Sequence, residues 1–132
     1  MDGAHLLPVR VYYEDTDAGG VVYHANYLRY CERGRSDFLR LLGIHQAEMA
    51  DTIFVVRRMA CEFIRPARLD DLLEVETCYV EGAGARLELE QKVRRGGELL
   101  FAAKVTAALI DRAGKPRRLP TGMIEALGRS YP

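Results

Sequence analysis

The sequence predicts an α+β fold in which one long helix packs on a five-stranded antiparallel sheet, in the order β-α-β-β-β-β. Only residues 25–42 show a sustained helical period of apolar residues. Four long segments with strand character follow, and the turns between them are short. Consecutive strands joined by short turns pair antiparallel, and a single helix must then cover one sheet face. The length of 132 residues suits a single domain, 1–132.

The first strand is expected near the N-terminal end of the chain. Val9, Val11 and Tyr13 alternate there with a period of two, which is typical of a strand. His5 and His45 lie in segments without clear periodicity, so we expect both histidines to be exposed.

The long helix is expected at residues 25–42, and Gly43 follows it in the position that usually ends a helix. Its apolar side carries Tyr27, Leu28, Cys31, Phe38, Leu39 and Leu42. We therefore interpret Cys31 as a core residue. Gly34 lies inside the helix, where glycine costs roughly 0.5–1 kcal/mol relative to alanine. A short further helical piece is expected at residues 46–50.

Four strands are expected in the second half of the chain. They are residues 52–63, 72–80, 86–94 and 99–110. Glycine-containing turns at 81–84 and 95–97 are typical of hairpins, and a short helix follows Pro120 with Thr121 as its N-cap. An open sheet has two edges, which proteins usually pair or cover. We therefore expect a homodimer in which the sheet continues across two subunits.

The composition argues against several classes of protein. Basic and acidic side chains number 19 each, so net charge does not favour binding of nucleic acid or anionic lipid. The three cysteines include no C-x-x-C pair, which indicates reduced thiols rather than a disulfide framework or a zinc site. No secretory signal is visible, and no stretch approaches the roughly 20 apolar residues of a membrane span. We expect a soluble, cytoplasmic protein without membrane insertion.

The connection at residues 12–27 holds more reactive side chains than a turn requires, and functional residues concentrate on such connections. Asp17 precedes Gly19 and Gly20, which let the backbone approach another group closely. The helix then begins with amides, near residues 22–24, that have no internal partner and can stabilise developing negative charge. If Asp17 faces these amides, the arrangement is suited to attack on a carbonyl group that the amides polarise. Acyl transfer or hydrolysis therefore stands beside a purely turn-forming role.

Other interpretations of these residues fit less well. An aspartyl phosphotransferase would need a parallel sheet, an aspartic protease would need Asp-Thr-Gly, and a P-loop would need Gly-Lys-Ser/Thr. His24 has no second histidine or cysteine at ligand spacing, so we expect no metal, and a structural role for its ring stays open. Arg57 and Arg58 are adjacent on a predicted strand and should point to opposite faces; one of them could meet the phosphates of coenzyme A.

The segment YYEDTDAGGVVYHANY, residues 12–27, strongly resembles the signature of hotdog-fold acyl-CoA thioesterases of the 4-hydroxybenzoyl-CoA thioesterase class. It is most similar to the branch associated with the Tol–Pal system (YbgC type), and the similarity continues through residues 32–35, 54–59 and 66–71. The resemblance implies a hotdog fold, a long helix wrapped by the five-stranded sheet. It also implies dimers with a continuous sheet, often paired into a homotetramer, and no cofactor.

The resemblance implies roles for individual residues as well. Asp17 would be the catalytic carboxylate, as nucleophile or general base, and the backbone N–H of His24 would polarise the thioester carbonyl. Tyr13 and the His24 side chain would orient the carboxylate or water. Substrate would lie between subunits, against Gly20, Val22, Tyr23, Asn26, Arg57, Arg58 and Met59. Glu14 and Asp15 are then interpreted as scaffold.

Three functions follow from these observations. The leading hypothesis is hydrolysis of acyl-CoA to free acid and CoA, without a metal or redox cofactor. A second is a subunit of an envelope or phospholipid-related assembly that binds acyl-CoA or acyl carrier protein with little turnover. A third is dehydration of a 3-hydroxyacyl chain, which would need a histidine and an acid in a different arrangement. Acyl carrier protein is a candidate partner, and the preferred acyl chain stays open.

Overall fold

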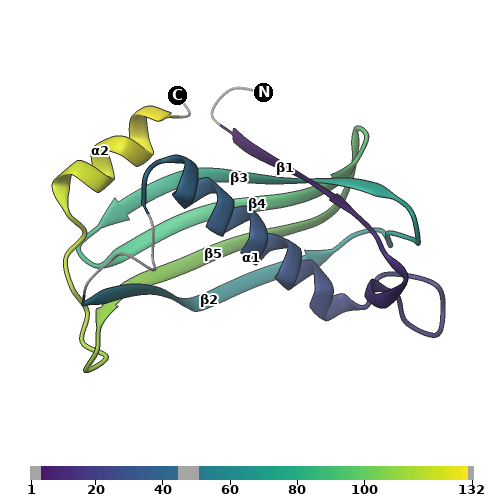
Figure 1. Ribbon diagram of the computed structural model, residues 1–132, viewed down its shortest axis with the longest axis horizontal. Helices are drawn as coiled ribbons and strands as arrows, with labels where there is room; N and C mark the ends of the chain where they lie inside the picture. The colour runs from purple at the N-terminus through teal and green to yellow at the C-terminus, as the bar shows by residue number, and fades with distance from the viewer. Residues whose placement is uncertain (1–3, 45–50, 131–132) are drawn as a thin grey trace.

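The computed structural model describes residues 4–44 and 51–130 (Figure 1). Its elements are β1 (Ala4–Arg10), the 3-10 turn η1 (Tyr13–Asp15), α1 (His24–Leu41), β2 (Thr52–Phe63), β3 (Leu72–Ala83), β4 (Arg86–Arg95), β5 (Glu98–Asp111) and α2 (Thr121–Ser130). The predicted α+β class and element order are confirmed, with the later strands close to their expected bounds. The helical piece expected at 46–50 lies outside the described residues, as does His45.

The five strands form one antiparallel sheet in the order β1-β3-β4-β5-β2. The helix α1 crosses one face of this sheet, and α2 lies beside the end of β3 (Figure 1). The hairpins β3–β4 and β4–β5 turn at Gly84 and Gly96, each with φ of 61°, a conformation that glycine adopts without strain. In the described chain β2 is an edge strand, and its outer side has no partner.

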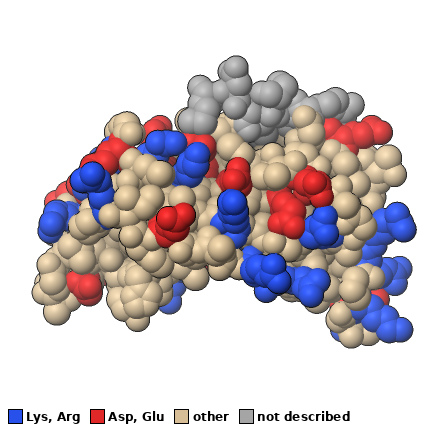
Figure 2. Space-filling view, turned by 180° about the vertical axis from the view of Figure 1, so that it is seen from behind, with Lys and Arg blue, Asp and Glu red and all other residues tan. Residues whose placement is uncertain are grey.

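The face of the sheet turned away from α1 carries charged side chains of both signs (Figure 2). On β4 the buried residues alternate with more exposed ones, as its sequence predicts. No helix in the described part of the chain is long and apolar enough to cross a membrane.

The first strand lies further toward the N-terminus than predicted. It ends at Arg10, and Tyr13 belongs to the 3-10 turn, because the buried Asp15 carboxylate accepts the Tyr12 N–H at 2.8 Å and bends the chain. The exposed position expected for His5 is wrong, since the residue is only 4% exposed. Pairing of β1 with β3 turns the His5 ring toward α1, where it lies 2.8 Å from the Asp37 carboxylate.

The core lies between α1 and the inner face of β1, β3, β4 and β5. Tyr27, Cys31, Phe38 and Leu39 are buried as expected. Leu28, expected among them, is 40% exposed. The helix packs mainly over β1, β3 and β4, which leaves the side of α1 that carries Leu28 less well covered.

A buried polar group lies beneath the middle of α1. The Gln91 amide donates to the Cys31 carbonyl and to Thr77 Oγ1, each at 2.9 Å, and its oxygen accepts Arg35 Nη1 at 2.9 Å. The close approach of helix and sheet depends on Gly34, because a Cβ there would lie 2.8 Å from Val75 Cγ1. Gly34 therefore does more than weaken the helix: it lets the helix pack this closely on the sheet.

The alternation of side chains along β2 is interrupted at one point. The register with β5 shifts between Val56 and Arg58, which leaves Arg57 as the extra residue of a β-bulge. Val56 pairs with Ala107 before the bulge and Met59 pairs with Val105 after it. The residues that face α1 therefore change from even to odd numbers. Both arginines are exposed, and the simple expectation of opposite faces does not apply across a bulge.

Candidate active site

The connection between η1 and α1 is a tight, internally bonded turn. Thr16 and Val22 form a β-bridge, and the Asp17 N–H donates to the Val21 carbonyl at 2.9 Å. The Gly20 N–H donates to the Asp17 carbonyl at 3.0 Å. Gly20 has φ of 80°, which the turn requires and a side chain would resist. This geometry fixes Asp17 at the tip of the turn.

The Asp17 side chain is exposed at this tip. Its Oδ1 accepts the Gly19 N–H at 2.8 Å. A Cβ on Gly19 would lie only 3.3 Å from that oxygen, so glycine leaves the carboxylate its place. In the described residues no other group bonds the carboxylate. No group of three or more acidic, histidine or cysteine side chains in this part of the chain is arranged to hold a metal ion.

The turn is braced against the first turn of α1. The Asn26 side chain donates through Nδ2 to the Asp15 carbonyl at 2.9 Å, and the Tyr23 N–H donates to the same oxygen at 2.9 Å. Burial raises the pKa of Tyr30, and the negative charge of Asp15 adds to this rise. The interpretation of Asp15 as scaffold is consistent with these bonds. Asn26, expected against substrate, is buried and braces the turn in this chain.

His24 is the first residue of α1, so its backbone N–H lies outside the helical ladder. Tyr23 at the N-cap offers no side-chain bond to the first turn. The His24 ring packs against Tyr23 at 4.4 Å and edge-on against Phe63 at 6.2 Å between ring centroids. Among the described residues no hydrogen bond joins this ring, or the 82% exposed Tyr13, to Asp17. The orienting roles of both side chains remain predictions.

A pocket of about 280 Å³ opens beside the start of α1. Its lining includes two residues expected against substrate or in catalysis, Val22 and His24, and it adds Tyr27 and the segment 63–66. The Tyr27 hydroxyl accepts the Ala67 N–H at 3.0 Å, and burial raises the pKa of Tyr27. This bond ties the residue that follows segment 63–66 to the helix, and so holds that part of the pocket lining against α1.

No residue of 64–66 was expected at the site from the sequence, although all three line the pocket. The signal for this part of the lining was the apolar pair Phe63 and Ile64 at the end of a strand, which stay 54% and 46% exposed. The next residues run beside the turn, since Val21 forms a bridge with Arg68. Arg68 is exposed and makes no ion pair in the described part of the chain.

Three of the other predicted substrate residues are not part of this pocket. Arg57, Arg58 and Met59 are on β2 and do not line it. Arg57 and Arg58 make no ion pair with a described residue. Three other arginines form ion pairs with acids of the same chain: Arg94 with Glu76, Arg95 with Asp71 and Glu98, and Arg117 with Asp111.

Comparison with known proteins identifies the family. A family model described as "Thioesterase superfamily" matches residues 19–102, more than half of the chain. The chain belongs to the thioesterase superfamily. The matched segment begins at Gly19, so it does not include Asp17.

Individual members of the superfamily are similar over most of the chain. The protein named acyl-CoA thioester hydrolase YbgC from Escherichia coli O6:H1 is 47% identical over 121 residues, 89% of this chain and 90% of that protein. Acyl-CoA thioesterase YbgC from Haemophilus influenzae is 46% identical over 114 residues, 84% of each chain. A crystal structure of a probable thioesterase from Bartonella henselae, 47% identical, has a TM-score of 0.85 and covers 89% of this chain and 99% of its own. The predicted hotdog fold is confirmed.

Proposed function

We propose that this thioesterase hydrolyses acyl-CoA to the free acid and CoA. The observation that carries the proposal is the Asp17 carboxylate, exposed and held by the Gly19 N–H at 2.8 Å, on a turn that leads into the first amide of α1. The names of the YbgC relatives support acyl-CoA as the substrate class. In this proposal the thioester carbonyl oxygen accepts the backbone N–H of His24, and Asp17 acts at the carbonyl carbon.

Two routes fit this geometry. As a general base, Asp17 takes a proton from water, the hydroxide adds to the carbonyl carbon, and the C–S bond breaks to release the CoA thiolate, which then takes up a proton. As a nucleophile, Asp17 displaces the thiolate and forms an anhydride, which water opens. In both routes negative charge develops on the carbonyl oxygen, where the His24 N–H and the helix dipole stabilise it.

The test is the rate of thiol release by Asp17→Asn. Asparagine keeps an oxygen that can accept the Gly19 N–H, so we expect the variant to fold and to lose about two to four decades of turnover. Glu14→Gln is the matched control, because Glu14 is an exposed acid of the same connection, and it should retain activity. Near-wild-type turnover by Asp17→Asn would contradict the proposal. Tight acyl-CoA binding by the wild-type protein without turnover would favour the binding-subunit hypothesis instead.

His24→Ala separates the side chain from the backbone of this residue. The ring packs on aromatic neighbours rather than on Asp17, so we expect the variant to lose less than about tenfold in turnover. A loss comparable to that of Asp17→Asn would assign the imidazole itself to the reaction.

We further propose a homodimer in which two β2 edges pair and continue the sheet, with two dimers forming a homotetramer. The unpaired edge of β2 supports the pairing. Light scattering on the purified protein gives the mass directly.

In this assembly the pantetheine arm lies along residues 57–63 of the neighbouring subunit, and Arg57, Arg58 and Arg68 are candidates for the CoA phosphates. Replacing each by alanine should raise KM with little change in kcat.

Acyl carrier protein as a partner and the Tol–Pal association are proposals that rest on family resemblance. Comparing turnover of the same acyl group on CoA and on acyl carrier protein tests the first. Co-purification with Tol–Pal components tests the second.

A further inference from the structure

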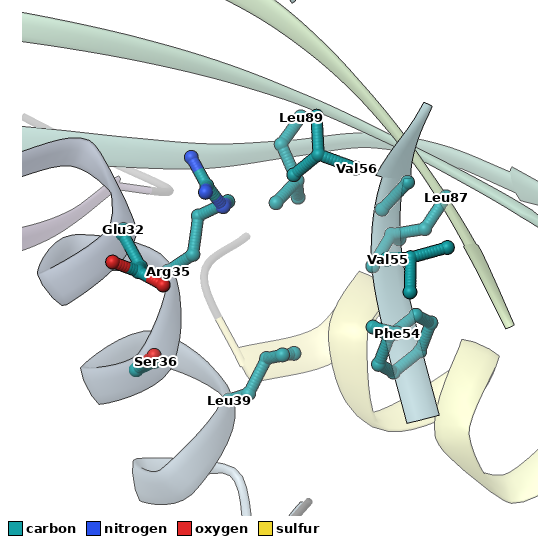
Figure 3. Close-up of a pocket in the computed structure, with 10 residues that line it drawn as sticks. Glu32, Arg35, Ser36, Leu39, Phe54, Val55, Val56, Leu87 and Leu89 are labelled. Carbon is teal, nitrogen blue, oxygen red and sulfur yellow. The ribbon is translucent and has the colours of Figure 1, made fainter. Parts of the chain in front are cut away.

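A second cavity, of about 180 Å³, lies between the later part of α1 and the start of β2. Figure 3 shows the Arg35 side chain extending from the helix toward the space in front of Leu89 and Val56. Leu39, Phe54 and Leu87 also line the cavity. A cation therefore reaches into an otherwise mainly apolar groove.

Arg35 is incompletely paired. Its Nη1 donates to Gln91 Oε1 at 2.9 Å, and Gln91 is itself fixed by Thr77 and the Cys31 carbonyl. A guanidinium has five N–H donors, and the other donors of Arg35 bond nothing else in the described residues. No carboxylate there lies within ion-pair distance, although the Glu32 carboxylate lines the same groove and acts on Arg35 through space. Burial lowers the pKa of Arg35. A partly desolvated charge of this kind is most stable beside an anion.

The groove and the pocket beside His24 lie at opposite ends of the contact between α1 and β2 and share no lining residue. The helix α1 and strand β2 run in opposite directions, so the start of α1 is beside the end of β2, as the contact of His24 with Phe63 shows (Figure 1). Leu28 and Arg35 follow His24 by four and eleven positions, which places all three on one stripe of the helix. At 1.5 Å per residue, Arg35 is roughly 16 Å along the axis from His24. The 40% exposed Leu28 lies between them.

We propose that Arg35 is a specificity-determining residue, which binds a terminal carboxylate on an acyl group that extends along α1 from the His24 amide. The inference rests on the proposed thioesterase function and adds a substrate class to it, the CoA monothioesters of dicarboxylic acids. In this proposal Leu28 and the apolar lining of the groove contact the methylenes, and the free donors of the Arg35 guanidinium meet the distal carboxylate. Charge-assisted pairing of this geometry is specific to an acid at one distance from the thioester.

The experiment compares kcat/KM for pairs of acyl-CoA substrates that differ only in a terminal methyl or carboxylate, over a series of chain lengths. The wild-type ratio of carboxylate to methyl should peak at one length. Arg35→Met keeps the aliphatic stem and should lower that peak roughly 10- to 100-fold, with the methyl substrates little changed. Arg35→Lys keeps the charge without the fork and should retain part of the preference. Arg33→Met, at an exposed arginine of the same helix, is the matched control.

Two results would overturn the inference. One is an equal effect of Arg35→Met on methyl and carboxylate substrates, which would make the arginine purely structural. The other is a change of oligomeric mass in that variant, which would assign Arg35 to a subunit contact. Calorimetric binding of both substrate types to Asp17→Asn separates this inference from the proposed function. Preferential binding of the carboxylate form that Arg35→Met abolishes supports the inference even if the wild-type protein releases no thiol, whereas turnover without any preference refutes it alone.

Discussion

Gly34→Ala is a substitution for which helix propensity and tertiary packing predict opposite changes in the stability of the protein. Alanine is favoured over glycine inside a helix by about 1 kcal/mol, so an isolated α1 would gain stability. In the folded protein the new Cβ would lie 2.8 Å from Val75 Cγ1, 3.1 Å from Thr77 Oγ1 and 3.3 Å from Gln91 Nε2. The first of these distances is far below van der Waals contact, so the helix or the sheet has to move.

The side chains around this site cannot easily move aside. Val75 and Thr77 are fully buried and β-branched, which restricts their rotamers. Displacing Gln91 would lengthen its bonds to the Cys31 carbonyl and to Arg35. Overpacking of a core costs about 1–3 kcal/mol, and this site belongs to the upper half of that range. After subtraction of the propensity gain we expect a net loss of about 1–2 kcal/mol, or roughly 3–6 °C in Tm.

The assay is urea and thermal unfolding at matched protein concentration, because subunit association contributes to apparent stability. Gly128→Ala is the control: Gly128 lies in α2, and a Cβ there meets nothing within 4 Å. That variant should be more stable by up to about 1 kcal/mol. A Gly34→Ala protein at least as stable as wild type would refute the packing argument, provided that Gly128→Ala shows the expected gain.

Three further predictions concern single side chains. Tyr27→Phe leaves the Ala67 N–H without its acceptor and should cost about 1–3 kcal/mol in urea unfolding. Burial alone would raise the pKa of Asp71, but hydrogen bonds from the Arg68 N–H and the Arg95 guanidinium hold this pKa below its ordinary value. The ionised Asp71 therefore stabilises the fold above about pH 4. Asp71→Asn should be less stable than wild type at neutral pH, and acid unfolding should show this difference vanish as the pH falls through the pKa of Asp71 in the folded protein. Burial raises the pKa of Cys31 to about 12, so mass spectrometry after alkylation at pH 8 should find it the last of the three cysteines to react.

Local sequence patterns determined most of the secondary structure. The helical period placed α1 within one residue of its observed ends, and alternation with glycine turns placed β2 to β5. These signals act over a few residues, because a helix or a hairpin is specified by its own side chains and turn conformations. The resemblance carried by residues 12–27 placed the chain in its family before the fold was known. It also singled out Asp17, which lies at the tip of the turn as the glycines require.

The tertiary structure decided which side chains of these elements are buried and what they contact. Leu28 has the same helical period as the core residues, yet it is 40% exposed because α1 packs mainly on β1, β3 and β4. His5 is buried because β1 pairs with a strand far along the chain. Gly34 and Arg35 are neighbours in sequence, but one meets the sheet and the other an open groove. Each of these outcomes depends on where two distant segments meet, and no periodicity within one segment contains that information.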